Sequence, residues 1–208
     1  VRASQLGMKT ALVERDRLGG ICLNWGCIPT KALLKNAEIL NLFRKSEEFG
    51  ISHDNLRFDF SKIIQRSRGV ADKSEKGVAF LMKKNNVTTF TGSAKLAGKG
   101  VVEIYDVNQK LKETISASRI LLATGARARA LPGIAFDGKR VISSTEAMIL
   151  KEVPKSLLII GAGAIGVEFA YFYNALGTKV TLVEMMPRIL PIEDHEVSDL
   201  LARSFRKS

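Results

Sequence analysis

An α/β fold with two strand–helix–strand units, the first carrying an inserted β-meander, is predicted by three features of this sequence. The clearest is the run 157–184, where a buried strand, a glycine-rich turn, a helix and a second strand ending in an acid follow one another. The second half of that run is repeated near the start of the chain, where a helix end is followed by Gly7, a strand and Glu14. Short alternating segments separated by Gly and Asn turns lie between the two. Both units are expected to be incomplete in this chain.

The glycine-rich turn at 161–166 reads G-A-G-A-I-G, and each glycine has a separate reason to be there. Gly161 permits a tight turn, Gly163 lets the backbone approach a pyrophosphate, and Gly166 allows the helix to pack closely on the sheet. The phosphates would lie at the positive end of the helix. Glu184, about twenty residues on, is placed to accept hydrogen bonds from an adenosine ribose, which favours NAD over NADP. This run predicts a Rossmann-like NAD-binding unit; a tight loop without a nucleotide is the simpler alternative.

Residues 6–14 repeat residues 176–184, because both combine a leucine, a glycine, a short strand and a terminal glutamate. The repeat predicts a second dinucleotide site, at which Glu14 would hold a ribose. A surface glutamate that merely ends a strand is the alternative for Glu14. The glycine loop of this first unit is absent ahead of it. We expect a first domain over residues 1–150 and a second over 151–208, since a new α/β unit opens at Ser156.

The remaining elements follow from hydrophobic periodicity and breakers, taken in chain order. Helices are expected over residues 1–6, from Leu33 towards Gly50, and over 167–176 and 198–207. Another helix is expected to begin at a cap formed by Asp59 or Ser61 and to continue as far as Met82. Strands are expected over 10–14, 87–91, 101–105, 112–116, 120–125, 157–160 and 177–184. The three segments at 87–91, 101–105 and 112–116 would form the β-meander, and 127–155 would be a connection.

Composition excludes several classes of protein. The 208 residues carry a formal net charge of +11, but the basic residues are scattered among acidic ones, so neither a nucleic-acid nor a membrane partner is expected. There is no run of eighteen apolar residues, and the first residues lack the apolar centre of a signal peptide. The chain starts without Met in mid-pattern and is expected to be a fragment. Two cysteines without a secretion signal favour a reducing, cytoplasmic setting.

Both cysteines, Cys22 and Cys27, lie in the stretch 18–31, with four residues between them and an expected tight turn at 24–26. Cys27 near a helix start favours a thiolate, so the pair suggests a redox disulfide. Two buried free cysteines, or half of a zinc site, are the alternatives. Zinc prefers four ligands, and His53 and His195 are far away in sequence, so no metal is expected. A redox pair between two dinucleotide units suggests a hydride-to-disulfide relay, with FAD as the first dinucleotide because flavin accepts both kinds of electron transfer.

The stretch 19–31, G-G-I-C-L-N-W-G-C-I-P-T-K, resembles the active-site motif of the flavin disulfide reductases, and the resemblance continues through 123–125, 143–147 and 183–191. It implies that Cys22 exchanges with a dithiol substrate and that Cys27 lies over the flavin as the charge-transfer thiolate. It also implies that Lys31 lies near flavin N5 and pairs with Glu168. The FAD contacts that it implies are Glu14, Gly20, Lys31, Ala94, Thr124, Gly125 and Ala126.

Within that family the resemblance is strongest to the branch that reoxidises dihydrolipoyl groups with NAD⁺. It implies a homodimer that acts on the lipoyl domain of a 2-oxoacid dehydrogenase acyltransferase or on a glycine-cleavage carrier protein. The dimerisation domain that supplies a His–Glu base is absent from these residues, and His195 does not match that motif. Glutathione-reductase-like and mercuric-reductase-like branches are the nearest alternatives, although Glu184 argues against an NADP-using one. A non-catalytic nucleotide-binding module is the alternative from another class.

Overall fold

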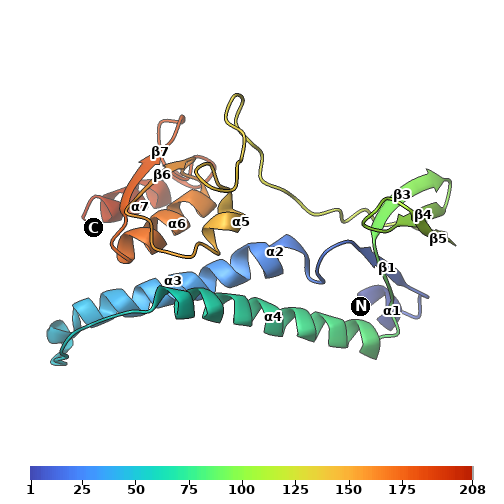
Figure 1. Ribbon diagram of the computed structural model, residues 1–208, viewed down its shortest axis with the longest axis horizontal. Coiled ribbons are helices and arrows are strands. Elements are labelled where there is room, and N and C mark those ends of the chain that lie inside the picture. Colours follow the sequence, from blue (N-terminus) through green and yellow to red (C-terminus); the bar gives the residue numbers. More distant parts are fainter. Residues whose placement is uncertain (208) are drawn as a thin grey trace. The chain divides into compact units, whose positions relative to one another are not determined.

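The computed structural model describes residues 1–207 and divides into two compact units. The first comprises Val1–Asn24 and Gly69–Arg127, and the second comprises Trp25–Arg68 and the chain from Ala128 onward. Figure 1 labels their helices and strands. These units are defined by contacts between residues, whereas the expected domains 1–150 and 151–208 are defined by the cofactor that each would bind. The division near residue 150 therefore stays a prediction. No helix in the described part is long and apolar enough to cross a membrane.

The first unit contains a parallel strand pair and an antiparallel sheet. After the short helix α1 (Arg2–Gln5), β1 (Ala11–Glu14) pairs in parallel with β2 (Thr88–Thr91), with Ala11 opposite Thr88. The strands β3 (Ser93–Gly98), β4 (Val101–Tyr105) and β5 (Leu111–Ser116) form the antiparallel sheet in that order. The mixture of parallel and antiparallel sheets agrees with the predicted α/β class.

The membership of the meander was predicted wrongly. The segment at 87–91 pairs with β1 and is not part of the antiparallel sheet, whose first strand β3 was missed. Its residues, S-A-K-L-A-G, have low strand propensity, so the pattern gave no signal. Gly92, at a φ of 154°, separates β2 from β3, and a Cβ there would lie 2.4 Å from the Tyr105 carbonyl oxygen. One glycine therefore switches the chain between two sheets.

The predicted strand at 120–125 is also wrong, since the structure contains no strand in this segment. Leu121 and Leu122 are 89% and 70% exposed. An apolar run predicts burial, but a strand forms only where a neighbouring strand accepts and donates its backbone hydrogen bonds. The described residues of the first unit provide no such neighbour for this segment.

The second unit contains the long helix α3 (Cys27–Arg44), the 3₁₀ turn η1 (Ser46–Phe49) and the first turns of α4 (Phe60–Lys84). Further along the chain come α5 (Ser144–Ala147), β6 (Ser156–Ile160), α6 (Ala164–Ala175), β7 (Lys179–Val183) and α7 (His195–Phe205). The predicted strand–helix–strand run is confirmed, because β6 and β7 pair in parallel with Ser156 opposite Lys179. Helix α5 lies inside the predicted connection and begins with a capping box between Ser143 and Glu146.

The cap of α4 is Asp59, as one of the two alternatives predicted. Its Oδ1 accepts the Lys62 backbone N–H at 3.1 Å and the Ser61 hydroxyl at 2.7 Å. Within the second unit, the part of α4 up to Arg68 lies beside α3 (Figure 1), with hydrogen bonds between Pro29 and Ser67 and between Ala32 and Arg66. The first turns of α4 therefore line the beginning of α3.

The core of the second unit lies where α3 packs against α6. Its buried members are Leu33, Ala37, Leu40, Phe60, Ala147, Met148, Phe169, Phe172, Tyr173, Ala175 and Leu176. Tyr173 is fully buried and its hydroxyl donates to the Ala147 carbonyl oxygen, which joins α6 to α5. Because the hydroxyl would otherwise be a buried polar group without a partner, this bond fixes the ring in place.

Tyr173→Phe is expected to lower the free energy of unfolding by about 1 kcal/mol at neutral pH, the usual net value of one hydrogen bond. Burial raises the pKa of Tyr173 above its ordinary value. The unfolded chain therefore releases this proton first, near a pH of about 10, and stability falls as pH rises further. Urea unfolding of the full-length protein at neutral and alkaline pH should show a shallower alkaline decline for Tyr173→Phe. Tyr171→Phe, on the same helix and less buried, is the control; equal declines for wild type and Tyr173→Phe would contradict the prediction.

Candidate active site

The two cysteines form a disulfide, Cys22 from the short helix α2 (Gly20–Trp25) and Cys27 as the first residue of α3. Both residues are exposed. The expected tight turn at 24–26 is wrong for two of its three residues, because Asn24 and Trp25 belong to α2 and only Gly26 separates the helices. The expected position of Cys27 at a helix start is confirmed. An exposed disulfide at the positive end of an 18-residue helix suits thiol exchange.

Asn24 holds the backbone ahead of Cys22, a role that the motif alone did not reveal. Its side chain is 1% exposed, and its Nδ2 donates to the carbonyl oxygens of Leu18 at 2.9 Å and Gly20 at 3.1 Å. Gly19 and Gly20 have φ angles of 104° and 68°, which favour glycine at both positions. The loop that leads into Cys22 is thus fixed by a buried amide and two left-handed glycines. An Asn close to such glycines is the signal that could have identified it.

Arg17 anchors the same loop to α4 within the first unit. Its guanidinium lies 2.6 Å from the Asp72 carboxylate and also bonds the Glu75 carboxylate. These hydrogen bonds, to Glu75 first and then to Asp72, raise the pKa of Arg17 above its ordinary value. Sequence reasoning missed Arg17, since its partners are 55 and 58 residues away along the chain.

Lys31 and Glu168 form an ion pair between α3 and α6, as the resemblance implied. Lys31 lies about one turn after Cys27, and Glu168 lies on α6 shortly after the glycine-rich turn. Both residues belong to the second unit. An ion pair therefore connects the helix that starts at Cys27 to the helix that starts at the glycine-rich turn. The functional roles of the two side chains remain predictions.

The glycine-rich turn has the geometry that a pyrophosphate needs. Gly161 has a φ of 106°, and a Cβ at Gly166 would lie 1.9 Å from the Gly161 carbonyl oxygen, so only glycine fits there. Gly163 is the N-cap of α6 and offers no side-chain hydrogen bond to its first amides. A Cβ on Gly163 would meet nothing within 4 Å, which leaves open space beside the helix start. These residues fit the pyrophosphate of a bound dinucleotide.

Glu184 follows β7 directly and faces this loop. Its Oε1 accepts the Met186 N–H at 2.9 Å and its Oε2 accepts the Ala162 N–H at 2.7 Å. The bonds from Met186 and Ala162 lower the pKa of Glu184 below its ordinary value. An ionised carboxylate is an acceptor for hydroxyl groups and repels phosphate, so these residues fit a dinucleotide with free ribose hydroxyls.

Glu14 repeats this local arrangement at the end of β1. Its Oε1 accepts the Asp16 N–H at 2.9 Å, two residues on, as Glu184 does with Met186. The sequence repeat thus extends to hydrogen bonding, and Glu14 fits the ribose of a second dinucleotide. Support for the other implied FAD contacts is weaker. Ala94 lies exposed in β3, and Thr124, Gly125 and Ala126 lie in an exposed segment outside any helix or strand.

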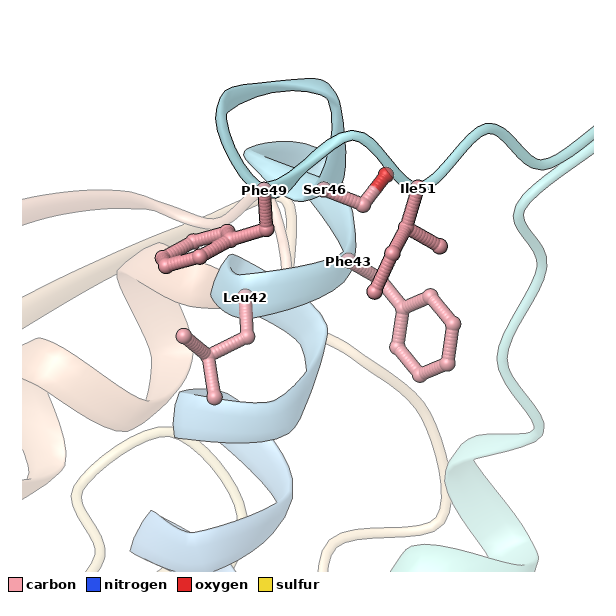
Figure 2. A pocket seen from close by; sticks show the side chains of 5 residues that line it. All are labelled: Leu42, Phe43, Ser46, Phe49 and Ile51. Carbon is pink, nitrogen blue, oxygen red and sulfur yellow. The ribbon is translucent and has the colours of Figure 1, made fainter.

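An apolar hollow of about 270 Å³ lies at the far end of α3 from Cys27. Figure 2 shows Leu42 and Phe49 on one side of it and Ile51 and Phe43 on the other, with Ser46 between them. Ser46 is the one polar residue among these five, so the lining has no charged group to orient a nucleotide. We assign no function to this hollow. No cluster of three or more metal-ligating side chains occurs among the described residues.

Comparison with known proteins places these features in a family. A family model described as pyridine nucleotide-disulphide oxidoreductase matches residues 1–208. The chain belongs to this family. Membership implies a flavin and a nicotinamide nucleotide as cofactors, consistent with the disulfide and the glycine-rich turn described above.

Curated relatives extend the similarity over the whole chain. A protein from Chlorobaculum tepidum named dihydrolipoyl dehydrogenase is 50% identical over 208 residues, covering 100% of this chain and 44% of that protein. A protein of the same name from Bacillus subtilis is 40% identical over 214 residues, covering 100% and 45%. The crystal structure of LpdA from Mycobacterium tuberculosis superposes with a TM-score of 0.87 at 23% identity, covering 99% of this chain and 45% of that one. This chain therefore spans less than half the length of these relatives.

Proposed function

We propose that this chain is part of a dihydrolipoyl dehydrogenase, which oxidises protein-bound dihydrolipoamide and passes the electrons through Cys22–Cys27 and FAD to NAD⁺. The observation that carries the proposal is the disulfide at the start of α3 together with the Lys31–Glu168 pair that ties α3 to the glycine-loop helix α6. The names of relatives at 40% and 50% identity support the same activity.

Thiol exchange would use the chain's own sulfurs. A substrate thiolate attacks Sγ of Cys22, the disulfide breaks, and Cys27 leaves as a thiolate at the helix start. The second substrate thiol then attacks the mixed disulfide, which releases oxidised lipoamide and leaves Cys22 as a thiol. Two electrons have thus moved from the substrate dithiol to the cysteine pair. Bound FAD supplies the conversion of an electron pair on sulfur into hydride, for which NAD⁺ is the acceptor.

The other residues would bind and orient. Glu14, Gly20, Ala94 and the 124–126 segment would contact FAD, within a flavin-binding domain over residues 1–150. Gly161, Gly163, Gly166 and Glu184 would hold NAD, in a domain that begins near residue 151. Lys31, oriented by Glu168, would place a positive charge beside the flavin. The substrate would be the lipoyl domain of a 2-oxoacid dehydrogenase acyltransferase or a glycine-cleavage carrier, and the complete cytoplasmic enzyme would be a homodimer.

The test is formation of NADH from NAD⁺ and dihydrolipoamide by the full-length protein, with NADP⁺ in parallel. We expect turnover with NAD⁺ to exceed that with NADP⁺ by at least about tenfold, equivalent to 1.4 kcal/mol of repulsion at Glu184. Reduction of glutathione disulfide and of Hg(II) is measured with the same preparation. Turnover of glutathione disulfide or Hg(II) that is faster than turnover of dihydrolipoamide would assign the protein to another branch of the family. Salt-dependent binding of nucleic acid without any turnover would favour a non-catalytic module.

A further inference from the structure

Three consecutive residues of α4 contact residues 25–32, the segment that contains Cys27, and all of these contacts lie within the second unit. The Arg66 Nη1 donates to the Ala32 carbonyl oxygen at 2.9 Å, and the Ser67 hydroxyl donates to the Pro29 carbonyl oxygen at 2.9 Å. The Arg68 Cζ lies 4.1 Å from the centroid of the Trp25 ring. Ser67 is completely buried, so α4 is seated firmly here.

These contacts lie on both sides of Cys27 in the sequence. Trp25 precedes Cys27 by two residues and Pro29 follows it by two, so the α4 backbone at Ser67 and Arg68 lies along the first turn of α3. Trp25 also lies in the segment that the disulfide closes between Cys22 and Cys27. The guanidinium is therefore held against the ring of a residue two positions before Cys27.

A charge held in this position has an electrostatic consequence. Arginine stays ionised under all ordinary conditions, and its planar guanidinium stacks well on an indole face. Salt largely screens exposed charges that are more than about 8 to 10 Å apart, so a fixed cation acts on a thiolate that lies within this range. Reduction of the disulfide creates negative charge on Cys27, whereas the oxidised form carries none. The cation therefore stabilises one side of the redox equilibrium.

We propose that Arg68, seated on Trp25, is a positioning residue that shifts the Cys22–Cys27 equilibrium towards the reduced pair. The inference rests on the proposed redox function of this disulfide. With dithiothreitol as the reductant, the dithiol becomes a cyclic disulfide, and the pair becomes a Cys22 thiol and a Cys27 thiolate with release of one proton. The same balance applies to a dihydrolipoyl substrate.

The test measures this equilibrium directly in the full-length protein. Samples equilibrated with mixtures of reduced and oxidised dithiothreitol are quenched in acid, alkylated under denaturing conditions and digested with trypsin. Cleavage after Arg17 and Lys31 yields one peptide, residues 18–31, that carries both cysteines. Its doubly alkylated fraction gives the equilibrium constant for reduction without depending on turnover.

Arg68→Gln is expected to lower that constant about three- to tenfold, where tenfold corresponds to about 30 mV for a two-electron couple. Arg68→Lys, which keeps the charge, should stay within about twofold of wild type. Arg66→Gln removes the same charge two residues away, from a contact at Ala32, and should also stay within about twofold. If Arg68→Gln does not fold, Trp25→Leu is used in its place. Without the Trp25 ring the guanidinium is no longer held in position, so the equilibrium constant for reduction should shift in the same direction.

Two results would overturn the inference. One is a wild-type equilibrium constant in Arg68→Gln, or in Trp25→Leu where that variant replaces it. The other is an equal shift in Arg66→Gln, which would indicate a general charge effect in place of this contact. The proposed function fails by a different result, namely no NAD⁺-linked oxidation of dihydrolipoamide by the wild-type protein. The two failures are therefore distinguishable.

Discussion

Cys27→Ser is expected to reduce NAD⁺-linked oxidation of dihydrolipoamide by at least about a thousandfold, as for other groups that form the reacting covalent bond. Cys27 is the exposed first residue of α3 and the disulfide partner of Cys22. A serine oxygen can neither close that disulfide nor serve as the charge-transfer thiolate. The long-wavelength absorbance band of the half-reduced, FAD-loaded protein should therefore disappear. A band that survives in this variant would refute the role assigned to Cys27.

Cys22→Ser is the matched control, since it removes the other sulfur of the same bond. It should also lose turnover, because no sulfur remains to exchange with the substrate. Cys27 then has no sulfur with which to form the disulfide and provides the thiolate at the helix start, so the absorbance band should be retained, even without added reductant. Equal spectra for the two variants would show that the cysteines do not have the separate roles proposed here. Urea unfolding of both variants checks that neither loses its fold.

The glycine-rich turn between β6 and α6 could be predicted because its structure is local. Gly161, Gly163 and Gly166 act through the backbone conformation and close approach of a six-residue turn, which a sequence pattern encodes directly. The position of Glu184 could be predicted too, because only one helix and one strand separate it from the turn. The same local logic located Cys27 at a helix start and Asp59 as a cap.

Contacts across long sequence separations could not be read from periodicity. Lys31 and Glu168 are 137 residues apart, and the resemblance to a family implied their pairing where no pattern did. Arg17 with its carboxylates, and Arg68 on Trp25, had neither signal. Tertiary packing determines these partners: it places Asp72 and Glu75 beside Arg17 in the first unit and Arg68 beside Trp25 in the second.

Strand pairing was unpredictable for a related reason. Whether residues 87–91 join β1 or the antiparallel sheet depends on a single break at Gly92, and strand propensity is the same in either case. The segment 120–125 has the composition of a buried strand, yet no strand pairs with it among the described residues. The FAD contacts at Ala94 and at 124–126 consequently stay predictions, because the local structure around them gives no independent support.

Gly163→Ala is expected to weaken NAD⁺ binding by at least about tenfold, or 1.4 kcal/mol, without destabilising the fold. A Cβ at this position meets nothing within 4 Å, and the φ of −71° suits alanine. Stability should even rise by about 0.4 to 1 kcal/mol, since alanine restricts the unfolded chain. The added methyl group would occupy the open space at the start of α6 that the pyrophosphate must approach. Calorimetric titration with NAD⁺ and thermal unfolding of the full-length protein measure the two effects.

Gly166→Ala, three residues along the same turn, should behave differently. Its Cβ would lie 1.9 Å from the Gly161 carbonyl oxygen, so the backbone must move, at a cost of about 1 to 3 kcal/mol typical of overpacking. Both stability and NAD⁺ affinity should fall, because displacing Gly161 distorts the loop. Normal NAD⁺ affinity in Gly163→Ala would contradict the assignment of this space to the pyrophosphate. A loss of affinity in Gly163→Ala at full stability, beside a loss of both in Gly166→Ala, separates contact with the ligand from support of the loop.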